Sequence, residues 1–300
     1  MGLCNLSELN IEKIKDQKEL NDAVKTAAFI GTLQAGYTDF FYLRDGWRKT
    51  AERDALLGVS LTGIASQSDL SQFDFNEAAR VAVTENERVS ALIGINKAKR
   101  VTTVKPSGTS SLVLKTSSGV HAWHSPFYIR RMRFNKAEAI ALYLKERLPA
   151  LVVDSKESPG DTCILEIPVK APEGGIMRNE SALDLLKRVS TFNTTWIKSG
   201  HIEGENKHNV SCTISVKNGE WPDVREWMWD NRRDYGGIAL FPFADADYPQ
   251  LPFEEITEER YNEMLKDLHE IDLTQILEDS DDTDLKGELA CAGGGGCEVT

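Results

Sequence analysis

A turn rich in small and hydroxylated residues is the first feature of this sequence that could do chemistry. The residues Lys105, Pro106, Ser107, Gly108, Thr109, Ser110 and Ser111 directly follow a β-branched segment, Arg100 to Lys105, that predicts a strand. Such a turn exposes backbone N–H groups, and a helix starting there adds partial positive charge, so the turn suits a phosphate group. It is not a Walker loop, because the Gly-Lys-Ser/Thr ending is missing. A plain strand-to-helix turn with a serine N-cap remains the alternative.

A pair of cysteines near the C-terminus is the second such feature. Cys291 and Cys297 are separated by five residues, four of them consecutive glycines. Thiols on a flexible tether can exchange disulfides in another site and then reach a reductant, which favours a thiol shuttle. A zinc site is disfavoured because no histidine lies closer than His269, and an inert tail is the remaining alternative.

The other cysteines and histidines carry weaker signals. A lone cysteine such as Cys4 is more often a small core residue than a reactive thiol. Cys163 and Cys212 alternate with apolar residues in predicted strands, which indicates core positions. His121 and His124 flank a tryptophan in a loop of small residues, where a hydrogen-bonded structural role is expected.

The composition predicts a globular protein with an acidic C-terminal end. The 300 residues are 41% hydrophobic and 27% charged, with a net charge of −12. All of the excess lies in residues 254–300, with 15 acidic against 3 basic side chains. Residues 88–137 hold ten basic and no acidic side chains, which either attracts phosphorylated ligands or forms a solvated face. The overall acidity disfavours nucleic acid as a partner.

The start of the chain and its cysteines predict a cytoplasmic protein. No apolar run approaches the roughly 20 residues that a membrane span needs, and the N-terminus lacks a signal-peptide pattern. Five scattered cysteines argue against a framework of structural disulfides.

Helical and strand-like segments alternate along the chain, which predicts an α/β fold with helices outside a largely parallel sheet or barrel. The expected helices are 21–34, 76–95, 136–147, 181–198, 221–232 and 254–268, and the expected strands are 100–105, 162–169, 209–216 and 237–243. We expect residues 1–277 to form the folded part and residues 278–300 to form a mobile acidic tail with the cysteine pair.

Several of these segments, in this order, resemble segments of adenosylcobalamin-dependent (class II) ribonucleotide reductases. The segment Cys4-Asn5-Leu6-Ser7-Glu8 is similar to the one that holds a cysteine oxidised during reduction of the ribose 2′-hydroxyl. Pro106 to Ser111, with Thr116 to Gly119 and His124 to Pro126, resembles the loop that binds substrate phosphates and its continuation. Later similar segments are His208-Asn209-Val210-Ser211, Gly236-Gly237-Ile238 and Pro252 to Ile256.

The resemblance is greatest to the monomeric, triphosphate-using branch. Adjacent tyrosines of the oxygen-dependent class and a glycyl-radical motif are both absent. The resemblance implies the C-terminal half of the ten-stranded α/β barrel of these reductases and adenosylcobalamin as cofactor. It implies that a thiyl radical abstracts the 3′-hydrogen of a ribonucleoside triphosphate or diphosphate. It also implies that Pro106, Ser107, Gly108, Thr109, Ser110 and Ser111 bind substrate, that Cys4 supplies one reducing thiol, and that Cys291 and Cys297 pass electrons from a thioredoxin-like protein.

The sequence departs from the family by lacking the Asn-Pro-Cys-x-Glu loop that supplies the radical cysteine. That loop and the partner of Cys4 are expected in an upstream half, so the chain is expected to be inactive alone, as a split-enzyme subunit or a truncated fragment. Two alternatives remain open: a nucleotide-binding subunit that never turns over, and a stand-alone thiol oxidoreductase, which the absence of a Cys-x-x-Cys motif disfavours. The resemblance also implies that parts of about 150–211 and 255–285 contact the cobalamin, but no contacting residue and no metal ligand can be named from the sequence.

Overall fold

The computed structural model describes residues 2–67, 69–243 and 248–276. The chain divides into two compact units. Unit 1 comprises Met1–Trp123 and Glu173–Phe243, and unit 2 comprises His124–Pro172 and Ala244–Thr300. Unit 2 is therefore an insertion into unit 1 followed by the C-terminal segment. Cys291, Cys297 and the predicted tail lie outside the described residues.

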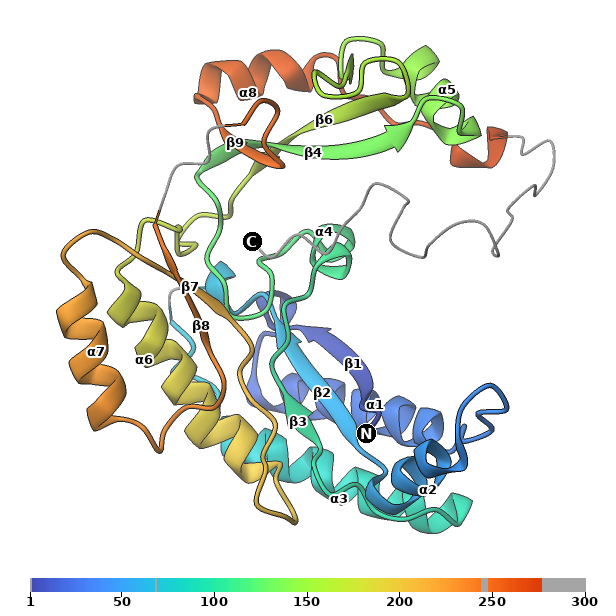
Figure 1. The fold of residues 1–300 in the computed structure, drawn as a ribbon, viewed down its shortest axis with the longest axis vertical. Helices are drawn as coiled ribbons and strands as arrows, with labels where there is room; N and C mark the ends of the chain where they lie inside the picture. The colour runs from blue at the N-terminus through green and yellow to red at the C-terminus, as the bar shows by residue number, and fades with distance from the viewer. Residues whose placement is uncertain (1, 68, 244–247, 277–300) are drawn as a thin grey trace. The chain divides into compact units, whose positions relative to one another are not determined.

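Unit 1 is built on parallel strands. β1 (Asn5–Asn10) pairs with β2 (Leu57–Thr62), which pairs with β3 (Thr102–Thr103), and β7 (Thr213–Val216) pairs with β8 (Ala239–Pro242) (Figure 1). A parallel bridge between Val104 and Val210 joins the two sheets. All six residues of β2 are buried, as expected for a strand covered on both faces.

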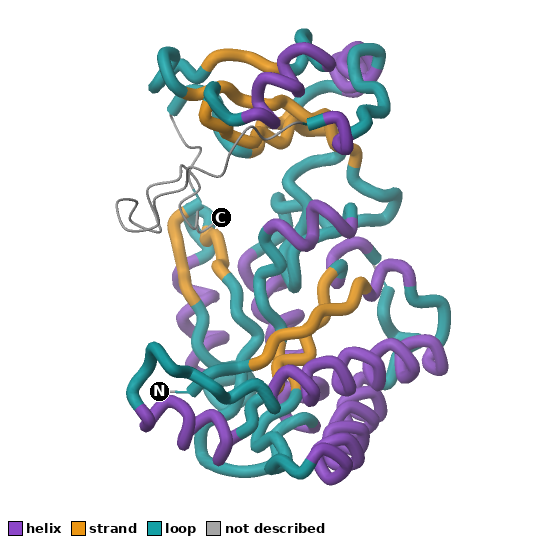
Figure 2. Tube along the Cα trace, turned by 90° about the vertical axis from the view of Figure 1, so that its right-hand side faces the viewer, coloured by secondary structure: helices purple, strands orange, loops and turns teal. Residues whose placement is uncertain are grey.

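Helices provide the connections that parallel strands require. They are α1 (Gln17–Ala35), α2 (Asp45–Asp54), α3 (Phe75–Ile93), α4 (Thr109–Leu114), α6 (Ala182–Phe192) and α7 (Trp221–Asp230). The side chains of Asp16, Asp74 and Ser181 cap α1, α3 and α6 by accepting hydrogen bonds from first-turn N–H groups. Figure 2 shows that α1 and α3, which pack on each other, lie outside the strands of this unit.

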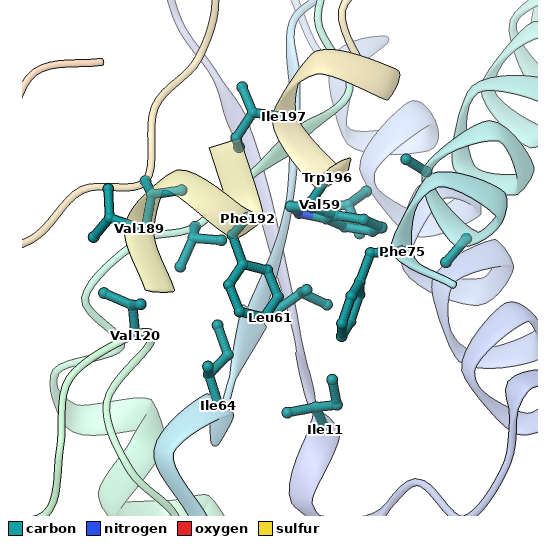
Figure 3. Close-up of a cluster of buried hydrophobic side chains, with 14 of the residues drawn as sticks. Ile11, Val59, Leu61, Ile64, Phe75, Val120, Val189, Phe192, Trp196 and Ile197 are labelled. Atoms are coloured by element: carbon teal, nitrogen blue, oxygen red, sulfur yellow. The ribbon is translucent and has the colours of Figure 1, made fainter. Parts of the chain in front are cut away.

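The core of unit 1 centres on Trp196, which is fully buried in a π-helical turn, Asn193–Ile197, that follows α6 (Figure 3). Its indole Nε1 donates to the carbonyl of Thr103 at 3.0 Å, and its own carbonyl accepts from Thr102 Oγ1 at 2.7 Å. The rings of Phe75 and Phe192 pack beside it with centroids 4.8 Å apart. This turn therefore fixes β3 to the helical layer.

Unit 2 is an antiparallel sheet with helices. The strands β5 (Val152–Asp154), β6 (Thr162–Lys170), β4 (Phe127–Asn135) and β9 (Phe253–Glu255) are hydrogen-bonded in that order. The helices α5 (Ala139–Arg147) and α8 (Glu258–Leu265) contribute Leu144 and Met264 to a core that also contains Leu165. Short 3-10 turns at Ile11–Lys13, Ile64–Ser66 and Leu273–Gln275 complete the described elements.

The α/β class predicted from the sequence is confirmed, and the parallel arrangement holds for unit 1. The predicted helix 254–268 is wrong at its start, because residues 253–255 form β9 and Thr257 caps a helix that begins at Glu258. β4 was not predicted, since its arginines hide the strand pattern and Arg131 is buried through ion pairs with Glu166 and Glu254. Among the described helices, none combines the length and apolar character of a membrane span.

Gly200 offers a test of the packing around Trp196. An alanine Cβ there would lie 2.0 Å from Oγ1 of the buried Thr102. Gly200→Ala should therefore lower the free energy of unfolding by about 1–3 kcal/mol, measured by denaturant titration. The matched control is Gly46→Ala, where a Cβ in α2 meets nothing within 4 Å and stability should stay equal or rise slightly. Equal losses in both variants would contradict this packing.

Candidate functional site

The predicted phosphate turn lies between β3 and the short helix α4. Gly108 precedes α4 with φ of +52° and ψ of −124°, a conformation that side chains disfavour, and no side chain caps the helix. The serine N-cap alternative is therefore wrong, because glycine occupies the cap position. Thr109 and Ser110 are exposed at the start of α4, where N–H groups lack intrahelical partners.

Loop 116–119 and strand β2 hold this turn in place. The Ser107 N–H donates to Ser118 Oγ at 2.9 Å, and the Lys105 N–H donates to Ser60 Oγ of β2 at 3.0 Å. Gly119 has φ of +54°, and a Cβ there would lie 2.4 Å from the carbonyl oxygen of Lys105. The first residues of the turn are thus anchored to β2 and to loop 116–119.

The hydroxyl groups of the turn are not equivalent. Ser107 Oγ donates to the Glu8 carboxylate at 2.7 Å, and Ser111 Oγ donates to the Gly108 carbonyl at 2.8 Å. The hydroxyls of Ser107 and Ser111 are therefore engaged within the protein, whereas Thr109 and Ser110 present theirs on an exposed surface. Glu8 also places a carboxylate beside the turn, a feature that the sequence reasoning missed.

The basic stretch between residues 88 and 137 is divided between the two units. Its members Arg130, Arg131, Arg133 and Lys136 belong to unit 2. Ion pairs engage many of the charges, namely Arg88–Glu85, Lys97–Glu87, Lys99–Asp54, Arg131–Glu166 and Lys136–Asp154. Half of the ten basic residues are thus engaged in ion pairs, and Lys105 is the basic residue within the turn itself.

Cys4 lies at the start of β1, where its thiol packs on the backbone of β2. A Cβ added to Gly58 would lie 2.8 Å from Cys4 Sγ and 3.2 Å from Cγ2 of Thr103. Only glycine leaves space for a thiol this close to the strand. Cys4 is half-buried, so it is not one of the fully buried core residues, and it forms no disulfide with the other described cysteines.

His208 lies next to Cys4, with 3.8 Å between Nε2 and Sγ. Its other ring nitrogen, Nδ1, lies 3.1 Å from the carbonyl oxygen of Thr102. Burial raises the pKa of the Cys4 thiol to about 11, although the charges of Lys105 and Arg100 act in the opposite direction. Burial lowers the pKa of His208 to about 4, so both groups are neutral near pH 7.

The phosphate turn and Cys4 are both attached to strands of one sheet. Cys4 precedes β1 and the turn follows β3, while β2 pairs with both strands. Lys105 acts electrostatically on Cys4 and is also the first residue of the turn. The segment His208 to Ser211 joins them, because Val104 N–H donates to the Asn209 carbonyl at 3.3 Å.

The other sequence candidates have structural roles. His121 Nε2 accepts from the Thr213 N–H at 3.1 Å, and its Nδ1 lies 3.1 Å from the Ser118 carbonyl oxygen, which confirms the structural role expected for it. Cys163 and Cys212 are 2% and 6% exposed, as predicted for core positions. Burial raises the pKa of Cys212 to about 12, which disfavours its reactive thiolate.

The curated relatives of this chain share a common name. It is 26% identical over 245 residues to a probable adenosylcobalamin-dependent ribonucleoside-triphosphate reductase of Dictyostelium discoideum, covering 76% of this chain and 30% of the relative. The adenosylcobalamin-dependent ribonucleoside-triphosphate reductase of Euglena gracilis is 27% identical over 296 residues, covering 90% and 36%. That of Lacticaseibacillus paracasei is 23% identical over 298 residues, covering 93% and 38%. No protein-family model matches the chain.

The fold has a solved counterpart. A crystal structure of a B12-dependent (class II) ribonucleotide reductase matches 89% of this chain and 40% of its own chain, with a TM-score of 0.70 and 20% identity. The resemblance stated from the motifs is thus confirmed by relatives that cover most of the chain. The chain itself spans about a third of the length of these curated relatives.

Proposed function

We propose that this chain, which is similar over most of its length to adenosylcobalamin-dependent ribonucleoside-triphosphate reductases, takes part in reducing ribonucleotides to deoxyribonucleotides. The observation that carries the proposal is the common sheet, which bears a cysteine before β1 and a glycine-hinged turn after β3. A substrate held by its phosphates at such a turn extends its ribose away from them. Cys4, which precedes a strand of the same sheet, is then a candidate to contact the ribose of the substrate.

The turn would bind phosphate through backbone and hydroxyl donors. The exposed hydroxyls of Thr109 and Ser110, the Thr109 N–H and the Lys105 ammonium are the donors available for this, because the Ser110 N–H already donates to the Ser107 carbonyl at 3.1 Å. Pro106, Ser107, Gly108 and Ser111 would shape the turn. Because Glu8 already accepts the Ser107 hydrogen bond, we expect Ser107 to orient the turn rather than to contact phosphate.

Cys4 would supply one of two reducing thiols. In the overall reaction, two thiols and a ribonucleotide give a disulfide, a deoxyribonucleotide and water, so the two electrons from the thiols replace the 2′-hydroxyl by hydrogen. Cys163 belongs to unit 2, and both Cys163 and Cys212 are buried. We therefore propose that the second thiol, like the radical cysteine, comes from a region of the relatives that this chain does not cover.

The cofactor proposed for this reaction is adenosylcobalamin, because the relatives are named adenosylcobalamin-dependent reductases. A cavity of about 750 Å³ in unit 1 is bordered by Phe73, Asp74 and Thr195. Cavities of this volume suit drug-sized ligands, and no described residue identifies this one as a cobalamin site. No residue is therefore assigned to the cofactor, and no step is derived through it.

Cys291 and Cys297 are proposed to re-reduce the disulfide that forms at Cys4. One tail thiolate attacks the disulfide, the second resolves the mixed disulfide, and the oxidised tail then accepts two electrons from a thioredoxin-like protein. The four glycines between the two cysteines support this role because they allow the two thiols to meet in one disulfide. A nucleotide-binding subunit without turnover is the alternative, and reconstitution separates the two.

Reconstitution with an upstream half tests this function. The chain should form deoxynucleotide with adenosylcobalamin only when a second polypeptide supplies the regions of the relatives that it does not cover. Replacing both Cys291 and Cys297 by serine should stop multiple turnover with thioredoxin while sparing turnover with dithiothreitol, which enters the site directly. Product would be measured by chromatography. Reduction by the isolated chain, or equal loss with both reductants, would contradict the assigned roles.

Gly108 tests the phosphate turn. A Cβ at Gly108 meets nothing within 4 Å, so Gly108→Ala acts only through its positive φ, at a cost of about 1–3 kcal/mol that distorts the turn. Affinity for a ribonucleoside triphosphate, measured by calorimetry on the reconstituted enzyme, should fall about tenfold, which corresponds to roughly 1.4 kcal/mol.

The matched control is Gly94→Ala at the end of α3, where φ is +74° and a Cβ also meets nothing within 4 Å. It should lower the thermal midpoint by a similar amount and leave nucleotide affinity unchanged. Unchanged affinity in Gly108→Ala with an intact fold would show that the turn is only a structural connection.

A further inference from the structure

The ring of His208 is fixed by the backbone of β3. A carbonyl oxygen only accepts, so the 3.1 Å contact between Nδ1 and the Thr102 carbonyl requires a proton on Nδ1. The neutral imidazole then carries an unprotonated Nε2, and this nitrogen lies 3.8 Å from Cys4 Sγ. The tautomer set by Thr102 thus directs a lone pair toward the thiol.

Neighbouring residues restrict the position of the Cys4 sulfur. Gly58 lies directly against Sγ, and Thr103 borders the same space, since a Cβ on Gly58 would contact both residues. Cys4 and His208 are 204 residues apart in sequence, and both are partly buried. Their approach depends on the parallel bridge between Val104 and Val210, which places the His208 segment beside β3.

We infer that His208 is a positioning residue for Cys4, accepting the hydrogen bond of its thiol at Nε2 and holding the sulfur in one orientation at the start of β1. The importance of this contact for redox chemistry rests on the proposed function, in which Cys4 is a reducing thiol. The hydrogen bond favours the protonated thiol, which is less open to stray oxidation and alkylation than a thiolate.

Charged groups around the pair act on it from neighbouring segments. Arg100 precedes β3 and Lys105 follows it, and both positive charges favour the thiolate of Cys4 and the neutral form of His208. His201 also disfavours protonation of His208. A neutral imidazole that accepts from the thiol opposes the effect of the two cations on Cys4, and its removal should therefore increase the thiolate fraction.

Infrared spectroscopy of the purified full chain tests the hydrogen bond directly, without cofactor or nucleotide. The spectrum of the chain minus that of Cys4→Ser isolates the S–H stretching band of Cys4. Donation to Nε2 should lower the frequency of this band. His208→Asn keeps a polar group near the Nδ1 position but cannot reach Sγ, so the band should rise in frequency. His208→Gln places its amide near the Nε2 position and should restore the lower frequency.

The rate of Cys4 alkylation provides a second readout. Alkylation of Cys4 by iodoacetamide, followed by peptide mapping, should be about three- to tenfold faster at pH 8 in His208→Asn than in the unaltered chain, with His208→Gln close to the latter. Thermal midpoints of the same samples verify folding. If His208→Asn does not fold, nitrogen-15 NMR of the unaltered chain decides, because the inference requires protonated Nδ1 and unprotonated Nε2.

An unchanged S–H band in folded His208→Asn, or an Nε2-protonated tautomer, would overturn the inference. Either result would leave the proposed function standing, since Cys4 could act without this partner. Conversely, a failed reconstitution with the expected infrared shifts would overturn the proposed function and leave the hydrogen bond in place.

Discussion

Parallel pairing of β2 with β1 on one side and β3 on the other is the constraint on which the candidate site depends. Every residue of β2 is buried, so its register is fixed by packing on both faces. That register places Gly58 beneath Cys4 and Ser60 beneath the backbone of Lys105. A shift of one residue would turn Ser60 away from Lys105 and separate the two features.

The arrangement explains how residues distant in sequence share one region of unit 1. Trp196 fixes β3 from the helical layer, and the Val104–Val210 bridge brings the His208 segment to the outer side of β3. Glycines make this possible where backbones approach closely, as at Gly119 against Lys105. The chemistry proposed for Cys4 and for the turn therefore depends on a few sites of close backbone packing.

The sequence predicts the long elements of unit 1 well, because periodic apolar residues and capping side chains define α1, α3 and α6. It misses β1 and β2, and it also misses β4, where buried Arg131 is compensated by acidic partners that are distant in sequence. The turn at Gly108 could be predicted from residue types, whereas the role of Cys4 rests on family resemblance and stays a prediction. The contacts of Glu8 and His208 could not, because each depends on which strand lies beside which.

In the proposed reaction, the Cys4 thiol is one of the two thiols that are oxidised to a disulfide when a ribonucleotide is reduced. The most direct measurement is a single turnover of the reconstituted enzyme without external reductant, with Cys291 and Cys297 replaced by serine, stopped by alkylation and analysed by peptide mass spectrometry. We expect Cys4 to be recovered in a disulfide in proportion to the deoxynucleotide formed, while Cys163 and Cys212 stay reduced. Deoxynucleotide formed with Cys4 recovered entirely as a free thiol would contradict this expectation.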